Sequence, residues 1–139
     1  MGAGPERGPK VESVKTSAAV DQRARDLPFA GRLDASRDDV GTGVVEDRAH
    51  AVVLRLQLSA PGDRVESACF FAYGCPSAIA AASWAAEWMH GKGLDPAPDP
   101  EGLATELAAA LALPPAKHYA AELAALALLR AIGDRRSKR

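Results

Sequence analysis

The fold is decided in the stretch Phe70-Phe71-Ala72-Tyr73-Gly74-Cys75-Pro76-Ser77-Ala78-Ile79, where a strand is expected to end and a helix to begin. The residues up to Tyr73 are aromatic and favour strands, those from Pro76 onward are rich in alanine, and Gly74 supplies the backbone freedom for the change. Cys75 is therefore predicted at the N-cap, with Pro76 at the first helical position. The free amides of that first turn favour a thiolate, which binds metal or attacks an electrophile. Spacing alone leaves open the alternative that Cys75 is a small buried apolar residue.

Composition restricts the function classes. The 139 residues suit one domain, and the net charge of -1 argues against a general nucleic-acid binder, which needs a broad positive field. The two cysteines, Cys69 and Cys75, are too few for a disulfide framework and lie six residues apart, a spacing that no recognised zinc finger has. No uncharged apolar run approaches about 18 residues, so no membrane span is expected. These features predict a cytoplasmic protein.

The chain divides into three expected parts. Residues 1–15, rich in glycine, proline and charge, are expected to form a flexible leader. Residues 16–133 are expected to form the single folded domain, which begins with a short helix over Ser17–Leu27. Residues 134–139 carry the only basic cluster of the sequence and are expected to be a solvated basic tail.

Three strands are expected ahead of the cysteine. Gly41–Val45 reads as a short first strand, in which two glycines indicate a bend or a close backbone approach. Val52–Leu58 alternates apolar and other residues, which is typical of a strand with one buried face. The turn Pro61-Gly62-Asp63 then leads to a third, antiparallel strand over Val65–Tyr73, whose second face is expected to meet a partner or the leader.

Three helices are expected after the cysteine. The first follows Cys75 and is closed by His90 and Gly91, the second covers about residues 100–111, and the third continues to about Ile132, where Gly133 stops it. Strands followed by helices predict an α+β fold, a small three-stranded antiparallel sheet with three helices packed on one face.

Three stretches, taken in order and with their separations, resemble the IscU-type (NifU-like) iron-sulfur cluster assembly scaffold family. They are Val40–Val45, then Tyr73–Ala80 running on into Glu87-Trp88 and Gly91–Leu94, and finally Leu113–Lys117. The similarity covers about residues 29–132, and that family has the same order of strands and helices.

This resemblance implies a protein that holds a nascent [2Fe-2S] cluster or iron, receives sulfur from a cysteine desulfurase and passes the cluster to acceptor apoproteins. It also implies that a heat-shock ATPase chaperone recognises the segment made of Leu113, Pro114, Pro115, Ala116 and Lys117. A homodimer that supplies further ligands is left open.

The resemblance also implies where the cluster ligands lie. The family's first cysteine falls on His50, its second on Cys75 and its third on Ala120, while its aspartate falls on Val52 and its histidine on Tyr119. The chain thus keeps one of three cysteines, and an imidazole at His50 can replace a thiolate. His118 is a further candidate, because it lies in the first turn of its helix and is expected to reach the strand end that carries Cys75. Glu122, one turn further along, is a candidate oxygen ligand.

Three functions follow as alternatives. The leading hypothesis is a divergent scaffold whose Cys75, His50 and His118 hold iron or a labile cluster. The second is a metal-free paralogue that binds and modulates the assembly machinery, and the third is a simple zinc or iron site of one thiolate and two imidazoles. No enzyme activity is expected, because no base is paired with Cys75 in the sequence.

Overall fold

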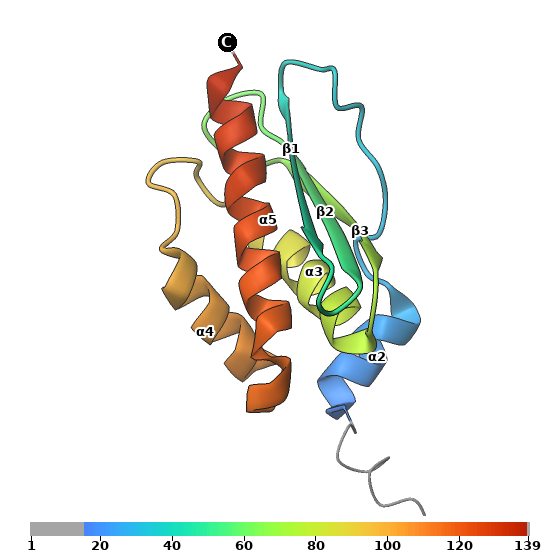
Figure 1. Ribbon diagram of the computed structural model, residues 1–139. Coiled ribbons are helices and arrows are strands. Elements are labelled where there is room, and N and C mark those ends of the chain that lie inside the picture. Colours follow the sequence, from blue (N-terminus) through green and yellow to red (C-terminus); the bar gives the residue numbers. More distant parts are fainter. Residues whose placement is uncertain (1–15, 139) are drawn as a thin grey trace, which may run out of the picture.

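The computed structural model describes residues 16–138, so the expected leader at residues 1–15 lies outside the described part of the chain. Eight elements follow one another (Figure 1): α2 (Ala18–Asp26), β1 (Val40–Asp47), β2 (Val52–Ser59), β3 (Ser67–Tyr73), α3 (Pro76–Met89), α4 (Pro100–Ala110), the 3-10 turn η1 (Pro115–Lys117) and α5 (His118–Ser137). The three strands form one antiparallel sheet in the order β1-β2-β3. The predicted α+β fold is confirmed.

The alternation of β2 sets the two faces of the sheet. In the register of the strands, Leu56 lies between Gly43 of β1 and Phe70 of β3, and the side chains of Leu56 and Phe70 are buried. One residue along, Arg55 pairs with Phe71, which is half exposed on the opposite face. A strand of period two therefore gives the sheet one face for the core and one for other contacts.

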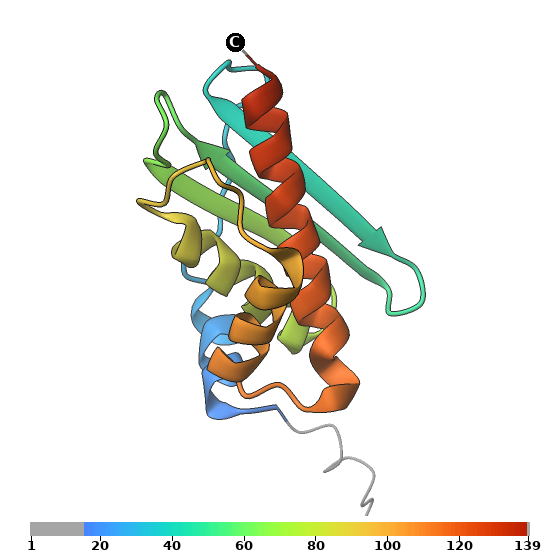
Figure 2. The same cartoon turned by 90° about the vertical axis from the view of Figure 1, so that its left-hand side faces the viewer.

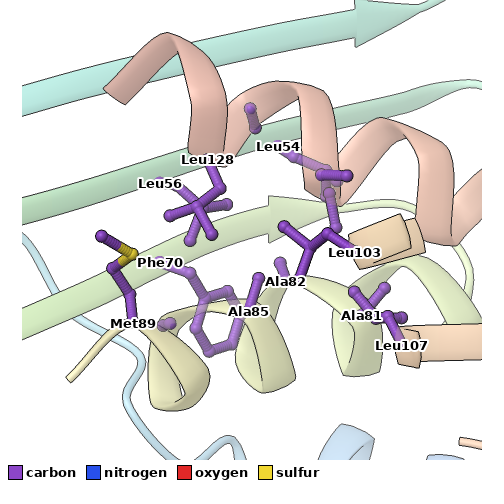
Figure 3. Close-up of a cluster of buried hydrophobic side chains, with 14 of the residues drawn as sticks. Leu54, Leu56, Phe70, Ala81, Ala82, Ala85, Met89, Leu103, Leu107 and Leu128 are labelled. Atoms are coloured by element: carbon purple, nitrogen blue, oxygen red, sulfur yellow. The ribbon is translucent and has the colours of Figure 1, made fainter. Parts of the chain in front are cut away.

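The helices cover the apolar face. Helix α5 packs on β1 and β2, α3 packs on β3 and β2, and α4 lies against α5. Figure 2 shows α5 crossing the sheet at an angle with α4 beside it. The core between these layers is made of large apolar side chains from both strands and helices, together with alanines of α3 (Figure 3): Leu54, Leu56, Phe70, Ala81, Ala82, Ala85, Met89, Leu103, Leu107 and Leu128. The many alanines let helices and sheet approach closely.

The two glycines of β1 lie where the backbone of α5 comes close to the strand, which confirms the close approach that was one of the two expected explanations for them. A methyl group added at Gly43 would overlap the carbonyl oxygen of Ala127 in α5 and come within 2.9 Å of the Cβ of Arg130. At Gly41 it would come within 2.9 Å of the backbone nitrogen of Arg135. Strand β1 and helix α5 are therefore in backbone-to-backbone contact.

The connection before β1 covers part of the other face. Ala30 forms a parallel bridge with Phe70, and the side-chain amide of Gln57 donates to the carbonyl of Leu33 and accepts from its N–H, at 3.0 and 2.9 Å. In Figure 1 this connection runs along the side of the sheet away from α5. Within the described residues, the segment between α2 and β1 therefore covers part of this face, while the leader that was expected as one possible covering lies outside them.

The predicted end of the last helix at Gly133 is wrong, because α5 continues to Ser137. The residues expected as a basic tail belong to the fold as far as Lys138. Arg135 Nε donates to the carbonyl of Ala60 at 2.7 Å, and Lys138 Nζ donates to the carbonyls of Ala35, Arg37 and Val40 at 2.7 to 3.1 Å. These contacts offset the small cost of a glycine inside a helix. Among residues 16–138, no helix is long and apolar enough to cross a membrane.

Candidate functional site

Cys75 lies at the joint that the sequence predicts. Strand β3 ends at Tyr73, Gly74 adopts a φ of +150°, and Cys75 is the N-cap of α3 with Pro76 in the first turn. A Cβ at Gly74 would approach the Cγ2 of Val52 to 2.9 Å, so both the φ angle and the space favour glycine. The thiol makes no capping hydrogen bond and is partly buried against the core, which leaves it for contacts with other elements.

Tyr119 provides the direct contact of that thiol. Its hydroxyl lies 3.0 Å from the Cys75 sulfur, although the two residues are 44 positions apart. The first turn of α5 carries Tyr119, and Figure 2 places that turn near the projecting turn between β1 and β2. The phenol therefore bridges the start of α3 and the β1–β2 turn.

His50 lies on the other side of Tyr119. Its imidazole stacks on the phenol ring with 3.6 Å between the ring centroids and 7° between the planes. The His50 Nδ1 lies 3.0 Å from Asp47 Oδ2, at the end of β1. The structure thus arranges a carboxylate, an imidazole, a phenol and a thiol in sequence, from Asp47 to Cys75.

The electrostatics of this row follow from its contacts. The hydrogen bond from His50 lowers the pKa of the Asp47 carboxyl. Burial, followed by the hydrogen bond with Cys75, raises the pKa of Tyr119 from its ordinary 10.0 to about 12. At neutral pH the phenol therefore keeps its proton and can donate it in a hydrogen bond to the sulfur.

We expect alkaline titration of the metal-free protein to show this shift. The absorbance of the Tyr119 phenolate should appear near pH 12 instead of 10.0. Because the pKa is higher in the folded state, the contribution of Tyr119 to stability is full below about pH 10 and is lost as the pH rises toward 12. Tyr119→Phe should remove the late step, and a late step that persists in this variant would contradict the assignment.

His118 does not join Cys75, contrary to expectation. Its Nε2 lies 3.0 Å from the carbonyl of Leu113, and its ring lines a cavity of about 790 Å³ between α4 and α5, together with Glu122 and Glu101. One step along a helix turns a side chain by about 100°, so Tyr119 takes the direction that His118 was expected to have. Within residues 16–138, no group of three or more His, Cys, Asp or Glu side chains is arranged to hold a metal.

The remaining candidates lie apart from this row. Cys69 points to the face of the sheet covered by the connection, its sulfur 4.0 Å from the Gln57 oxygen, and burial raises the pKa of its thiol. The segment Leu113–Lys117 forms the approach to α5. Leu113 is buried there, whereas Pro114, Pro115 and Ala116 are exposed, so this segment is accessible to a partner.

Sequence reasoning missed Asp47 and gave Tyr119 no role of its own. The signal for Asp47 is its spacing, because residues three apart in a tight turn can bring a carboxylate to an imidazole. For Tyr119 no local signal exists. Its role depends on the direction of one side chain at the start of α5, which only the packing of that helix fixes.

Comparisons with known proteins match this fold. The family model described as the NifU-like N terminal domain matches residues 26–139. The iron-sulfur cluster assembly scaffold protein IscU of Azotobacter vinelandii is 43% identical over 110 residues, which cover 78% of this chain and 84% of the relative. The protein of the same name from Escherichia coli strain K12 is 40% identical over 110 residues, with 78% and 84% covered.

Solved structures agree in fold at lower identity. A nitrogen-fixing NifU-like protein (N-terminal) from Brucella abortus superposes with a TM-score of 0.68 at 14% identity, covering 88% of this chain and 95% of that one. A putative iron-sulfur cluster assembly scaffold protein for the SUF system from Fervidobacterium islandicum gives a TM-score of 0.67 at 15% identity, covering 84% and 95%. These likenesses show a shared arrangement of helices and strands.

Proposed function

Because this chain belongs to the NifU-like N-terminal domain family, which its IscU relatives share, we propose that it is an iron-sulfur cluster assembly scaffold. Its cargo is iron or a labile [2Fe-2S] cluster, which it passes to acceptor apoproteins. The role is that of a carrier in the cytoplasm, without catalytic turnover.

The observation that carries this proposal is the placement of Cys75. Its sulfur lies at a helix N-terminus, is only partly buried, and is within 3.0 Å of a phenol on another element. The thiolate is the form of cysteine that accepts sulfur or binds iron. Cys75 is thus the sulfur acceptor or cargo ligand. His50, whose Nδ1 is held by Asp47, is the second candidate ligand and is separated from the thiol by the Tyr119 ring.

The ligand set of one chain is incomplete for a cluster. A [2Fe-2S] cluster takes four protein ligands, and in the described part Cys75 and His50 supply two. His118 and Glu122 face the α4–α5 cavity instead. We propose that a second copy of the chain or an acceptor protein completes the set, which makes the bound cluster labile.

The partners follow from the same family. A cysteine desulfurase supplies sulfur at Cys75, and a heat-shock ATPase chaperone binds the accessible segment Leu113–Lys117. The binding of the chaperone to this segment is supported by three consecutive exposed residues, Pro114 to Ala116.

A metal-free modulator of the assembly machinery is the second candidate. The observation in its favour is the stack of His50 on Tyr119, which fills the space between imidazole and thiol. In that role the chain keeps its partner surfaces and carries no cargo. A simple zinc site, the third alternative, has the support of one thiolate and one imidazole only.

Anaerobic reconstitution with ferrous iron and sulfide tests these roles. We expect visible absorption in the wild type and in Cys69→Ala, the matched control, and its loss in Cys75→Ala. Equal colour in the two cysteine variants would contradict the role of Cys75. Absent colour with retained desulfurase binding would favour the modulator, and zinc retained without sulfide would favour the zinc site.

A further inference from the structure

The contact between Cys75 and Tyr119 brings together two potential metal ligands of different kinds. The thiol sulfur and the phenol oxygen lie 3.0 Å apart, on α3 and α5. Metal–sulfur and metal–oxygen bonds of about 2.3 and 2.1 Å, at a right angle to each other, separate the two donor atoms by about 3 Å. The observed spacing is therefore that of two adjacent positions on one metal ion.

We propose that Tyr119 is an iron ligand, and that its oxygen and the Cys75 sulfur together bind a single ferric ion. This inference rests on the proposed function and names the cargo more closely, as mononuclear ferric iron held by mixed sulfur and oxygen ligands. Binding replaces the phenol and thiol protons by the metal and releases both to solvent. No electron changes hands.

The ligand chemistry favours this cargo over a sulfide-bridged pair of irons. Iron–sulfur clusters are held chiefly by thiolates, whereas a phenolate is a hard oxygen donor that binds ferric iron, as the tyrosine ligand of some haem proteins does. The side-chain atom that contacts the Cys75 sulfur is the hydroxyl oxygen of Tyr119, and the imidazole of His50 lies on the far side of the Tyr119 ring. The set is therefore harder than one made of cysteines.

His50 is placed to supply a third ligand. Asp47 holds its Nδ1 at 3.0 Å and so leaves Nε2 free, an arrangement that ligating histidines commonly have. In the structure the imidazole lies flat on the phenol ring, so that the two ring planes are parallel. The stack has to open before Nε2 and the Tyr119 oxygen can reach the same ion.

The test is addition of ferric nitrilotriacetate to the full-length protein under anaerobic conditions. We expect a visible phenolate-to-iron charge-transfer band, with enhanced tyrosine ring modes in the resonance Raman spectrum. Tyr119→Phe should abolish both signals and weaken ferric binding at least tenfold. Tyr73→Phe is the matched control, because Tyr73 is 66% exposed at the end of β3, and it should retain both signals.

Several outcomes would overturn the inference. The inference fails if the charge-transfer band survives in Tyr119→Phe or never forms in the wild type. It also fails if free thiols are lost and are not recovered after a chelator removes the iron, because ferric iron would then have oxidised the thiols instead of binding to them. A melting curve of Tyr119→Phe like that of the wild type shows that the fold is intact. If Tyr119→Phe loses no ferric affinity yet gives Cys75-dependent colour with ferrous iron and sulfide, the ligand role of Tyr119 fails while the scaffold function stands.

Discussion

Gly43→Ala should destabilise the protein by about 3 kcal/mol or more. The added methyl group would overlap the backbone carbonyl of Ala127, and a carbonyl in the middle of a helix cannot rotate away as a long side chain can. Either α5 moves off β1 or the strand bends, and both changes loosen the core beneath. Urea denaturation followed by circular dichroism measures the free energy of unfolding.

Gly133→Ala is the control with the opposite sign. Gly133 lies inside α5, and no atom lies within 4 Å of a Cβ added there. Alanine should therefore stabilise the protein by about 0.5–1 kcal/mol, through its better helix propensity. If both substitutions change stability by less than about 0.5 kcal/mol, β1 and α5 are not in the close contact described.

The same contact positions the candidate site. Strand β1 ends at Asp47, and helix α5 begins next to Tyr119. Since the glycines of β1 set the distance between strand and helix, they also set how the His50 ring meets the Tyr119 ring. A substitution at Gly43 that leaves the protein folded should consequently disturb the stack as well.

The elements that sequence patterns predicted well are those with a local cause. The alternation from Val52 to Leu58 gave β2 and its buried face, and Gly74 with Pro76 placed Cys75 at the start of α3. The helix expected over about residues 100–111 is α4, where the side chain of Asp99, the N-cap, accepts from the Gly102 N–H. In each case the residues that decide the structure are neighbours in the chain.

The features that sequence patterns could not predict depend on distant contacts. Helix α5 passes Gly133 because Arg135 and Lys138 donate to the carbonyls of Ala60 and Ala35, which lie 75 and 103 positions away in the chain. His118 and Tyr119 differ by one helical step, and only the packing of α5 on β1 decides which of the two faces Cys75. Of the predicted site residues, Cys75 and His50 both contact Tyr119, to which sequence reasoning gave no role, and their part in binding stays a prediction.

Adding ligands around Cys75 should make cluster binding persistent. The family resemblance implies ligands at the positions of His50, Tyr119 and Ala120. In the structure the Tyr119 hydroxyl contacts the Cys75 sulfur, and the His50 ring stacks on the Tyr119 ring. The triple variant His50→Cys, Tyr119→His and Ala120→Cys would offer three thiols and one imidazole, the number of ligands that a [2Fe-2S] cluster takes. After anaerobic reconstitution and desalting, it should retain the cluster absorbance that the wild type loses.

We expect a large gain in cluster retention because the three substitutions need no change in the backbone fold. Tyr119 reaches Cys75 from the first turn of α5, and a smaller imidazole at that position would vacate the space between positions 50 and 75. Adding Cys75→Ala to the triple variant should remove the gain, because the central thiolate is then missing. If the triple variant holds no more cluster than the wild type, with iron and sulfide measured per folded chain, positions 50, 119 and 120 do not converge on Cys75 as ligands. The site would then have diverged in its geometry as well as in its residues.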